Sequence, residues 1–468
     1  MQIGDVGEAK QRGLPRMRAY DKRRSQRGLA SLRASLADDQ GSNGDLRARD
    51  CAKTRSRAAE AGEERMSGEA SASKSAVVVT PPGTRLAELF AERSDARVAR
   101  SLARAGAQIA HSGAAAPRPG AEAPRSAAQL ASALPADALA LLVRGDAVVD
   151  ERVAKALLAS GELLLVARED GRDEPAAASI ASARAPEAAA WLAGGAAPAG
   201  LAKRTAEELV PAYTPELRKL APPLLRIATP ERAAAIERAL FDASYKGVTD
   251  FVTKYAWPPL AFRVVRWCAR LGVTPNAVTI ASWALVVLAF VAFSRGAFGA
   301  GLAAAWAMTF LDTVDGKLAR VTLNSSPFGH WLDHGLDIAH PPFWWAAWAY
   351  GLGLAFSSPL VLVVVGGYVV GRVVEGVFIL AFDFETHSWR PLDSFFRLIT
   401  ARRNPNLVLL SVFTLVGQPA LGFEAVAWWT ALSIAFHAVR LLYALALRAL
   451  GRQLRPWEEE AALARAAR

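Results

Sequence analysis

Four aspartates at fixed spacings lie between two long apolar runs, in the segment DTVDGKLARVTLNSSPFGHWLDHGLD at residues 312–337. Asp312 and Asp315 are three residues apart, and Asp333 and Asp337 are four apart. On helices, each pair therefore lies on one face. One carboxylate near the middle of a membrane helix costs about 2.5–3.5 kcal/mol on insertion scales, so four of them require neutralisation. Divalent cations bound by oxygen ligands are the obvious means.

The residues between the aspartates favour phosphoryl transfer. Gly316 removes a side chain directly after Asp315, where another group must come close, and Gly329 would serve the same purpose. Arg320 supplies a fixed cation for a phosphate. Carboxylates, metal ions, bare backbone and an arginine suit a reaction that depends mostly on positioning and charge neutralisation. The structural alternative is a helix pair whose aspartates are neutralised by nearby basic residues and backbone groups.

The segment resembles the signature of the CDP-alcohol phosphotransferases, D-x2-D-G-x2-A-R-x8-G-x3-D-x3-D. Its fixed positions are all matched, by Asp312, Asp315, Gly316, Ala319, Arg320, Gly329, Asp333 and Asp337. A match at every fixed position of so long a pattern is highly specific. The resemblance implies an enzyme that displaces CMP from a CDP-linked alcohol, with the hydroxyl of a second alcohol as the nucleophile.

The same resemblance implies roles for individual residues. Asp312, Asp315 and Asp333 would hold one or two Mg²⁺ or Mn²⁺ ions. Asp337 would share the metal site or act as the base on the incoming hydroxyl. The predicted catalytic residues are Asp337 and Asp333. The CDP group would lie against a set made up of Asp312, Gly316, Ala319, Arg320 and Gly329.

Composition divides the chain into two unlike parts. Of its 468 residues, 52% are hydrophobic, but the mean hydropathy of +0.17 averages a charged, alanine-rich first part and an apolar second part. From about residue 275 onward, apolar runs follow one another at about the twenty-residue length that a membrane-spanning helix needs. We therefore expect an all-α polytopic membrane core and an N-terminal cytoplasmic α/β domain. The core would occupy 275–450 as six transmembrane helices, at 276–294, 298–321, 328–350, 359–382, 405–422 and 425–447.

Basic residues gather on one side of these expected helices. The two short connections on the other side, 294–297 and 351–358, contain one basic residue, Arg295. By the positive-inside rule, the basic side is cytoplasmic. The prediction is a multi-pass protein of a bacterial-type inner (cytoplasmic) membrane, with both termini, the tail at 451–468 and the aspartates on the cytoplasmic side. The basic residues concerned are Arg263, Arg266, Arg270, Lys317, Arg320, Arg390, Arg397, Arg402, Arg403, Arg448, Arg452 and Arg455.

Residues 241–274 are predicted as a linker followed by an interfacial helix. The stretch KYAWPPLAFRVVRWCARL at 254–271 places apolar residues near one face and arginines on another, as in helices that lie along an anionic membrane surface. It would either cover the site and offer cations to substrate phosphates, or serve only as an anchor. Thr274 and Pro275 are the expected N-cap and first residue of the next helix.

Arginines in or near the later helices are candidates for binding the acceptor alcohol. Arg372 lies one turn before Glu375, so the two either neutralise each other or belong to an acceptor site. Arg440 lies inside the sixth expected helix and has no acidic residue near it in sequence. It is therefore the preferred candidate for binding an acceptor phosphate. Arg402 and Arg403 precede the fifth helix, where phosphate binding and membrane orientation explain them almost equally well.

The first part of the chain is itself divided. Residues 1–75 are rich in arginine and poor in large apolar residues, which predicts a disordered basic segment. The alternative, which we prefer, is a translation start at Met66, with the earlier residues not native. Residues 76–240 alternate between strand and helix patterns, which predicts a small α/β sandwich. Strands are expected at 76–80, 138–150 and 162–168, and helices at 151–160, 204–210 and 229–243.

One turn in this α/β part resembles the strand-turn of sugar-nucleotidyltransferase folds. It is the stretch LLVRGDAVVD at 141–150, in which Asp146 would help to hold a metal and a nucleotide. However, the glycine-rich nucleotide loop expected after the first strand is missing, because TPPGTR at 80–85 has one glycine. We therefore favour a degenerate domain that packs on the membrane core or binds a partner.

The function predicted from the sequence is metal-dependent transfer of a phosphatidyl or other substituted phosphoryl group from a CDP-alcohol to an acceptor alcohol, with release of CMP. CDP-diacylglycerol is the expected donor, and a polyol phosphate or a lipid alcohol the expected acceptor. One alternative transfers a CDP-linked polar headgroup to a lipid or polyol. Another is a non-catalytic metal-binding membrane scaffold. Membrane lipids are expected partners, nucleic acid is not, and a homodimer is left open.

Overall fold

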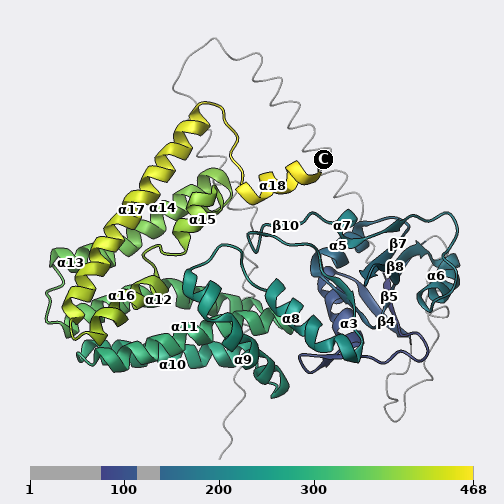
Figure 1. Cartoon of the computed structure of the whole chain (residues 1–468), viewed down its shortest axis with the longest axis horizontal. Coiled ribbons are helices and arrows are strands. Elements are labelled where there is room, and N and C mark those ends of the chain that lie inside the picture. Colours follow the sequence, from purple (N-terminus) through teal and green to yellow (C-terminus); the bar gives the residue numbers. More distant parts are fainter. Residues whose placement is uncertain (1–74, 113–137, 467–468) are drawn as a thin grey trace, which may run out of the picture. The chain divides into compact units, whose positions relative to one another are not determined.

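The computed structural model describes residues 75–112 and 138–466, without the side chains at positions 110–112, 327, 328, 330, 333, 334, 336 and 466. The segment predicted to be disordered, with Met66, lies outside the described residues apart from Ser75. Strands occupy the first described part of the chain and long helices the second (Figure 1). The α/β part and the helical part predicted from composition are therefore both present.

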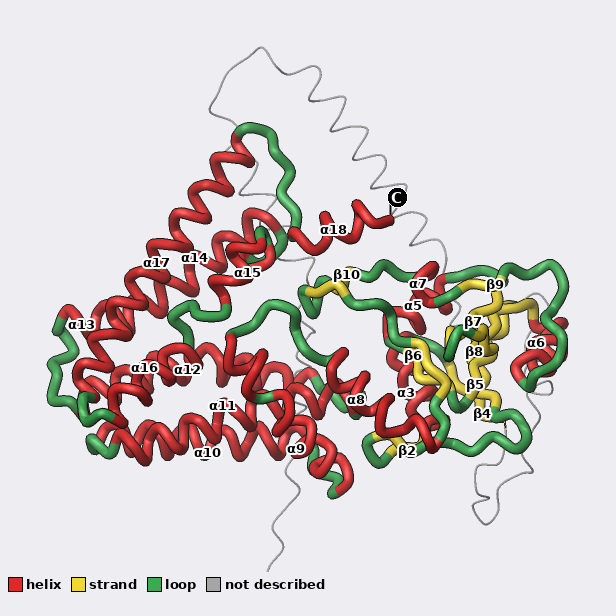
Figure 2. Tube along the Cα trace, in the orientation of Figure 1, coloured by secondary structure: helices red, strands yellow, loops and turns green. Residues whose placement is uncertain are grey.

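A six-stranded mixed sheet, with strand order β4-β1-β5-β8-β7-β9, organises the α/β part (Figure 2). Strand β1 is parallel to both neighbours, β7 is parallel to β9, and β8 is antiparallel to both β5 and β7. One strand therefore opposes the direction of all the others. The strands are β1 (Ser75–Val79), β4 (Gln108–Ser112), β5 (Leu139–Arg144), β7 (Leu163–Glu169), β8 (Arg172–Ala181) and β9 (Lys203–Arg204).

Helices cover both faces of this sheet. Successive residues of a strand point to opposite faces, so Val78 packs in one cluster with α3 (Ser94–Ala105) and α5 (Glu151–Ala159). Its neighbour Val77 packs in the other cluster with α6 (Ala185–Leu192). The two clusters make a three-layer α/β sandwich, as the alternating pattern predicted.

The run predicted as one strand at 138–150 is two strands, and the prediction of a single strand is wrong. Strand β5 ends at Arg144, and β6 (Ala147–Val149) leaves the main sheet to pair with β12 (Leu225–Ile227). Gly145 allows the break, because a Cβ there would lie 2.7 Å from the Thr80 Oγ1 atom. The alanine-rich elements β8 and α6 were not predicted.

A basic amphipathic helix, α9 (Pro258–Arg270), connects the two parts, after α8 (Ala233–Ala243) and a short π-helix, η3 (Val252–Ala256). It buries Ala261, Val265 and Cys268, while Leu260, Trp267 and Leu271 are exposed. Those exposed apolar residues form the face that the sequence assigned to the membrane interface. Next along the chain, Thr274 caps the following helix by accepting a hydrogen bond from the Ala277 N–H, as predicted.

Long helices build the second part. Their bounds are α10 (Pro275–Ser294), α11 (Phe298–Val321), α12 (Pro327–Gly351), α14 (Gly367–Phe382), α16 (Arg403–Leu415) and α17 (Pro419–Ala449). The short α13 (Pro359–Val361) and a π-helical stretch, η4 (Leu362–Gly366), lead directly into α14. Among the described residues, three helices are long and apolar enough to cross a membrane, at Pro275–Ser294, Pro359–Phe382 and Pro419–Ala449. The predicted membrane character is therefore confirmed, while six crossings stay a prediction.

The last two expected helices differ in their bounds from the sequence-based spans. Helix α16 ends at Leu415 instead of residue 422, and α17 begins at Pro419 instead of 425. Gly417, with φ +74°, makes the turn between them. Inside α17, Gly422 allows the two helices to approach closely. A Cβ atom at this position would lie 2.8 Å from the Cβ atom of Phe413. Because Gly417 lies in an apolar run, the turn at this residue was not predicted from the sequence.

Candidate active site

A cavity of about 390 Å³ lies where α11, α12 and α14 meet the loops before α16. It also receives side chains from the segment just before α9. Basic side chains outnumber acidic ones, so the cavity suits an anionic ligand. The basic lining residues are Arg218, Lys246, Lys317, Arg320, Arg372, Arg397, Arg402 and Arg403, and the acidic ones are Asp250, Asp312, Asp337, Glu375 and Glu385.

Two aspartates of the motif face each other across one arginine. Arg403 donates from Nη2 to Asp312 Oδ2 at 2.6 Å and from Nη1 to Asp337 Oδ1 at 3.0 Å. The Asp312 side chain is 12% exposed and that of Asp337 is 49% exposed. Helices α11 and α12 thus bring their carboxylates to one guanidinium at the first residue of α16. The sequence placed Arg403 near the aspartates but did not predict this bridge.

The other two motif aspartates are placed differently. Asp315 is buried, does not line the cavity, and accepts a 2.6 Å hydrogen bond from the Thr279 hydroxyl of α10. The Asp333 side chain lies outside the described side chains, although its backbone is in α12. Predicted roles for both as metal ligands, and for Asp333 in catalysis, stay predictions.

The small residues of the motif serve two different purposes. A Cβ at Gly316 would lie 3.2 Å from Arg320 Nη2, and both residues line the cavity, as expected of a phosphate-binding surface. A Cβ at Gly329 would lie only 2.5 Å from Asn276 Oδ1 of α10. Gly329 therefore permits a helix contact, and neither it nor Ala319 lines the cavity. That these two residues make room for CDP stays a prediction.

The aspartates fit a hard divalent cation. Asp312 Oδ1 is buried and has no hydrogen-bond partner among the described residues, while its other oxygen is bound by Arg403. A buried carboxylate oxygen without a donor is costly unless a cation satisfies it. Oxygen ligands from several carboxylates are the set that Mg²⁺ and Mn²⁺ prefer.

Asp250 positions the start of α16, and the sequence did not single it out. It accepts hydrogen bonds from Thr253 N at 3.0 Å, Thr253 Oγ1 at 2.8 Å and Asn404 Nδ2 at 3.0 Å. Burial alone would raise the pKa of the Asp250 carboxyl, but Arg397 and these donors outweigh burial and lower it. Because Asn404 directly follows Arg403, this ionised carboxylate fixes the backbone from which Arg403 reaches the motif.

Glu375 gathers the basic wall of the cavity. Arg372, one turn earlier on α14, and Arg402, from the loop before α16, both donate to its Oε2 atom. Its Oε1 atom lies 3.2 Å from His387 Nε2, in the turn η5 (Thr386–Ser388). Arg372 and Glu375 therefore form the ion pair that was one of the two predicted alternatives. Glu375 also binds Arg402 and holds it in the cavity wall.

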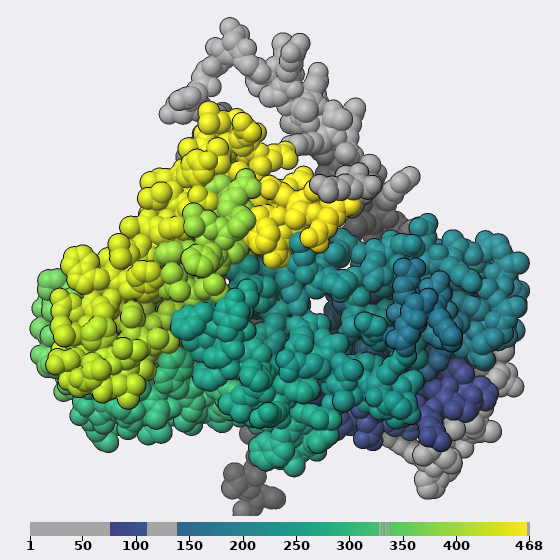
Figure 3. Space-filling view, in the orientation of Figure 1, coloured from purple at the N-terminus to yellow at the C-terminus, as the bar shows by residue number. Residues whose placement is uncertain are grey.

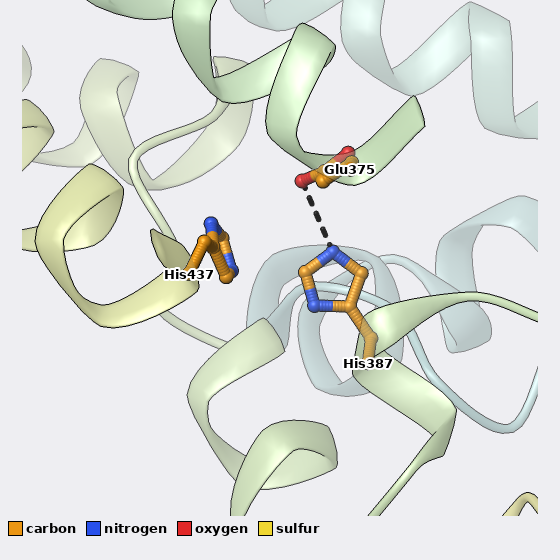
Figure 4. A group of neighbouring side chains, drawn as sticks. All are labelled: Glu375, His387 and His437. Carbon is orange, nitrogen blue, oxygen red and sulfur yellow. Dashed lines mark hydrogen bonds and ion pairs between the residues drawn. The ribbon is translucent and has the colours of Figure 1, made fainter. Parts of the chain in front are cut away.

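The ligand atoms of Glu375, His387 and His437 lie within 4.8 Å of one another, on α14, η5 and α17 (Figure 4). Two guanidiniums already neutralise the carboxylate of this cluster. A divalent ion would add two further positive charges beside them in a buried place. We therefore interpret the cluster as a support for Arg372 and Arg402. Burial, and then the charge of Arg402, lowers the pKa of His387 well below its usual value, so its ring is neutral.

Arg397 is a second residue that the sequence did not identify as part of a site. It lies at the end of α15 (Pro391–Arg397) and lines the cavity. Its Nε and Nη1 atoms are buried with no hydrogen-bond partner among the described residues. Burial and the charges of Arg402 and Arg218 lower the pKa of the Arg397 guanidinium, although Asp250 opposes them. Buried donors without acceptors inside a basic cavity indicate an anionic ligand.

With this geometry in hand, comparison with known proteins is informative. The sequence profile described as CDP-alcohol phosphatidyltransferase matches residues 272–401. These residues form a CDP-alcohol phosphatidyltransferase domain. The chain therefore contains a phosphotransferase domain, and the resemblance seen in the aspartate motif is confirmed. No curated protein matches the chain.

Solved structures similar to the chain include three of Mycobacterium tuberculosis phosphatidylinositol phosphate synthase (PgsA1). The apo form is 21% identical with a TM-score of 0.30, over 38% of this chain and 95% of that one. The form with CDP-DAG bound is 20% identical with a TM-score of 0.31, over 39% and 94%. The complex with manganese and citrate is 22% identical with a TM-score of 0.31, over 39% and 88%.

The cavity extends beyond the matched phosphatidyltransferase domain. Arg402 and Arg403 follow its last residue, while Arg218, Lys246 and Asp250 precede its first. The loop before α16 therefore lines the cavity, while phosphate binding by its two arginines stays a prediction.

Arg440, the preferred acceptor candidate from sequence, lies elsewhere. Its guanidinium donates to both oxygens of Asp393, at 2.6 and 2.8 Å, and lies over the Trp389 ring with its carbon 4.3 Å from the ring centroid. It does not line the cavity. Its partner Asp393 is distant in sequence but adjacent in the fold, and the acceptor-binding role of Arg440 stays a prediction.

Asp146, the candidate ligand of the α/β part, is similarly occupied. Arg144 donates to both of its carboxylate oxygens, at 2.8 and 2.7 Å, and its side chain is 4% exposed. Because Arg144 binds both oxygens of Asp146, neither is free to coordinate a metal ion, whereas Asp312 keeps one oxygen without a hydrogen-bond partner among the described residues. The preferred interpretation of the α/β part as a degenerate domain stays a prediction.

Proposed function

We propose that the chain transfers a phosphatidyl group from CDP-diacylglycerol, or a related group from another CDP-alcohol, to the hydroxyl of an acceptor alcohol, with release of CMP. The observation that carries this proposal is the bridge from Arg403 to Asp312 and Asp337 inside a basic cavity. The bridge brings both helices of the matched motif to one point. Phosphoryl transfer requires this kind of positioning and charge neutralisation more than any covalent step.

Asp312, Asp315, Asp333 and Asp337 are the residues that would hold one or two Mg²⁺ or Mn²⁺ ions. When bound, the ions would neutralise the diphosphate of the donor. Asp337, which is half exposed and lines the cavity, would accept the proton of the attacking hydroxyl. Arg320, beside the bare backbone of Gly316, would contact the CDP diphosphate.

The acceptor that suits the basic wall is a polyol phosphate. Arg372 and Arg402 are held there by Glu375, and Arg397 presents buried donors without acceptors. A phosphate of about two negative charges would satisfy these donors, whereas an uncharged lipid alcohol would leave them unsatisfied. An inositol phosphate or a glycerol phosphate has both the phosphate and the attacking hydroxyl.

The same proposal includes the topology. Six membrane crossings, with both termini and the cavity on the cytoplasmic side of an inner membrane, would give the site access to water-soluble CDP donors and acceptors. A homodimer through membrane helices is compatible with the exposed apolar faces of the long helices.

The experiment is CMP release by the purified chain, with CDP-diacylglycerol and CDP-linked polar headgroups as donors and a panel of acceptors, with and without Mg²⁺ or Mn²⁺. We expect release only with a metal and a phosphorylated polyol, and its loss in Asp337→Asn. Release with a CDP-linked headgroup and a lipid acceptor would favour the reversed donor. Failure with every CDP donor would favour the metal-binding scaffold.

A further inference from the structure

We infer that Arg218, from the α/β part of the chain, binds the phosphate of the acceptor and thereby contributes to acceptor specificity. The inference rests on the proposed function. It concerns a residue outside the phosphatidyltransferase domain, which begins at residue 272. The α/β part would then supply one wall of the acceptor site.

Arg218 lies in the turn between two short strands, β10 (Tyr213–Thr214) and β11 (Lys219–Leu220). Its side chain is 16% exposed, lines the cavity, and forms an ion pair with Glu385. The backbone has φ +50°, a conformation that costs a non-glycine residue about 1–3 kcal/mol and persists only where the surroundings impose it.

Three contacts impose this turn. The Gly247 N–H donates to Leu217 O at 2.8 Å, and a Cβ on Gly247 would lie only 2.4 Å from Arg218 O. Lys219 Nζ donates to the carbonyl of Ala243 at 2.7 Å, at the end of α8.

The third contact comes from the C-terminal helix α18 (Trp457–Ala466), which packs against this segment in the space-filling view (Figure 3). Its Glu458 Oε2 accepts from Leu220 N at 2.7 Å. Contacts from α8, from Gly247 and from the C-terminal helix α18 therefore hold Arg218 in a strained conformation at the cavity.

The position of Arg218 favours the acceptor over the donor. It pairs with Glu385 and is close enough to Arg397 to lower the pKa of that guanidinium, while Arg320 and Lys317 lie on the motif helix. Arg397 carries the buried donors assigned to the acceptor phosphate. Like charges that converge this closely repel each other, and a dianion between them relieves the repulsion.

The test is binding of inositol 1-phosphate and glycerol 3-phosphate, measured by titration calorimetry on the full chain in detergent without a CDP donor. Losing a charge-assisted hydrogen bond should weaken binding by about 10- to 100-fold in Arg218→Ala, with a smaller loss in Arg218→Lys. Arg168→Ala is the matched control, because that arginine is 69% exposed in the same α/β part and should bind as the wild type does.

A second variant moves the turn without changing any charge. Gly247→Ala should also weaken binding of the phosphorylated acceptor, because its Cβ displaces the Arg218 backbone. Gly161→Ala is its control, since nothing lies within 4 Å of a Cβ there. Unchanged binding in Arg218→Ala, or no binding of either phosphate by the wild type, would overturn the inference.

The KM values for the acceptor and for the donor, measured by CMP release, distinguish failure of this inference from failure of the proposed function. Arg218→Ala should raise the KM for the phosphorylated acceptor while leaving the KM for CDP-diacylglycerol near its wild-type value. A rise confined to the KM of the donor overturns the acceptor assignment and leaves the phosphotransferase standing. A wild-type chain that binds the phosphates through Arg218 but releases no CMP from any donor overturns the proposed function alone.

Discussion

Arg403 donates its Nη2 to Asp312 Oδ2 at 2.6 Å, across 91 residues of sequence. The contact ties the first residue of α16 to the helix that begins the aspartate motif. The guanidinium also reaches Asp337, so one cation offsets the repulsion between two carboxylates that face the same cavity. The proposed catalytic centre therefore depends on a residue that follows the matched domain.

Asp312→Asn should nearly abolish turnover. The change removes the negative charge that Arg403 and the metal share but keeps the shape of the side chain. We expect a loss of kcat on the order of 10²–10³-fold, measured by CMP release. Asp383→Asn is the matched control, because that exposed residue caps α14 at φ +63°, a conformation that asparagine tolerates. Near wild-type kcat in Asp312→Asn would contradict the assigned role.

Gly329→Ala should destabilise the protein through a helix contact. Its Cβ would lie 2.5 Å from Asn276 Oδ1 and 3.0 Å from Ser326 Oγ. Overpacking of this kind costs about 1–3 kcal/mol, which should lower the thermal unfolding midpoint in detergent. Gly335→Ala, on the same helix with nothing within 4 Å, should leave the midpoint equal or higher. An equal response from the two variants would contradict the helix-contact role of Gly329.

The motif and the long elements could be predicted because their signals are local. The spacing of Asp312 and Asp315 identified the family, and apolar runs located α10 and α11 to within a residue. The valine-rich run AVVVT at 76–80 likewise predicted β1. Such signals depend on residues within a few positions of each other, which share one face of a helix or strand.

The rest required three-dimensional partners. Nothing around Arg440 in sequence indicates Asp393, which lies 47 residues away, and nothing around Arg397 distinguishes it from an orientation charge. Ion pairs between distant elements depend on the packing of whole helices, and local patterns do not encode that packing. The alanine-rich β8 was missed because alanine has little intrinsic preference for a strand.

Arg440→Ala should affect stability and not acceptor binding. Its partner Asp393 has a fully buried side chain, so removing the guanidinium leaves an uncompensated carboxylate. Breaking a buried pair costs about 3–5 kcal/mol, which thermal unfolding in detergent should show as a lower midpoint. The double variant Arg440→Met with Asp393→Leu should recover part of the loss, because it removes both charges. A raised KM for the acceptor with an unchanged midpoint would instead restore the acceptor role predicted for Arg440.

Acidification should destabilise the protein through His387. Burial, and then Arg402, depresses the pKa of this imidazole in the folded state, whereas in the unfolded chain it titrates near 6.5. The unfolded state therefore binds the extra proton first, and stability falls as pH falls below about 6.5. At about pH 5.5 the loss from one neutral buried histidine is about 1.4 kcal/mol.

The measurement is the thermal unfolding midpoint of the wild type and His387→Gln in detergent at about pH 7.5 and about pH 5.5. Glutamine keeps a donor for Glu375 Oε1 but does not titrate, so the drop in midpoint between the two pH values should be smaller in the variant. An equal drop in both proteins would show that His387 is not the group whose protonation destabilises the fold.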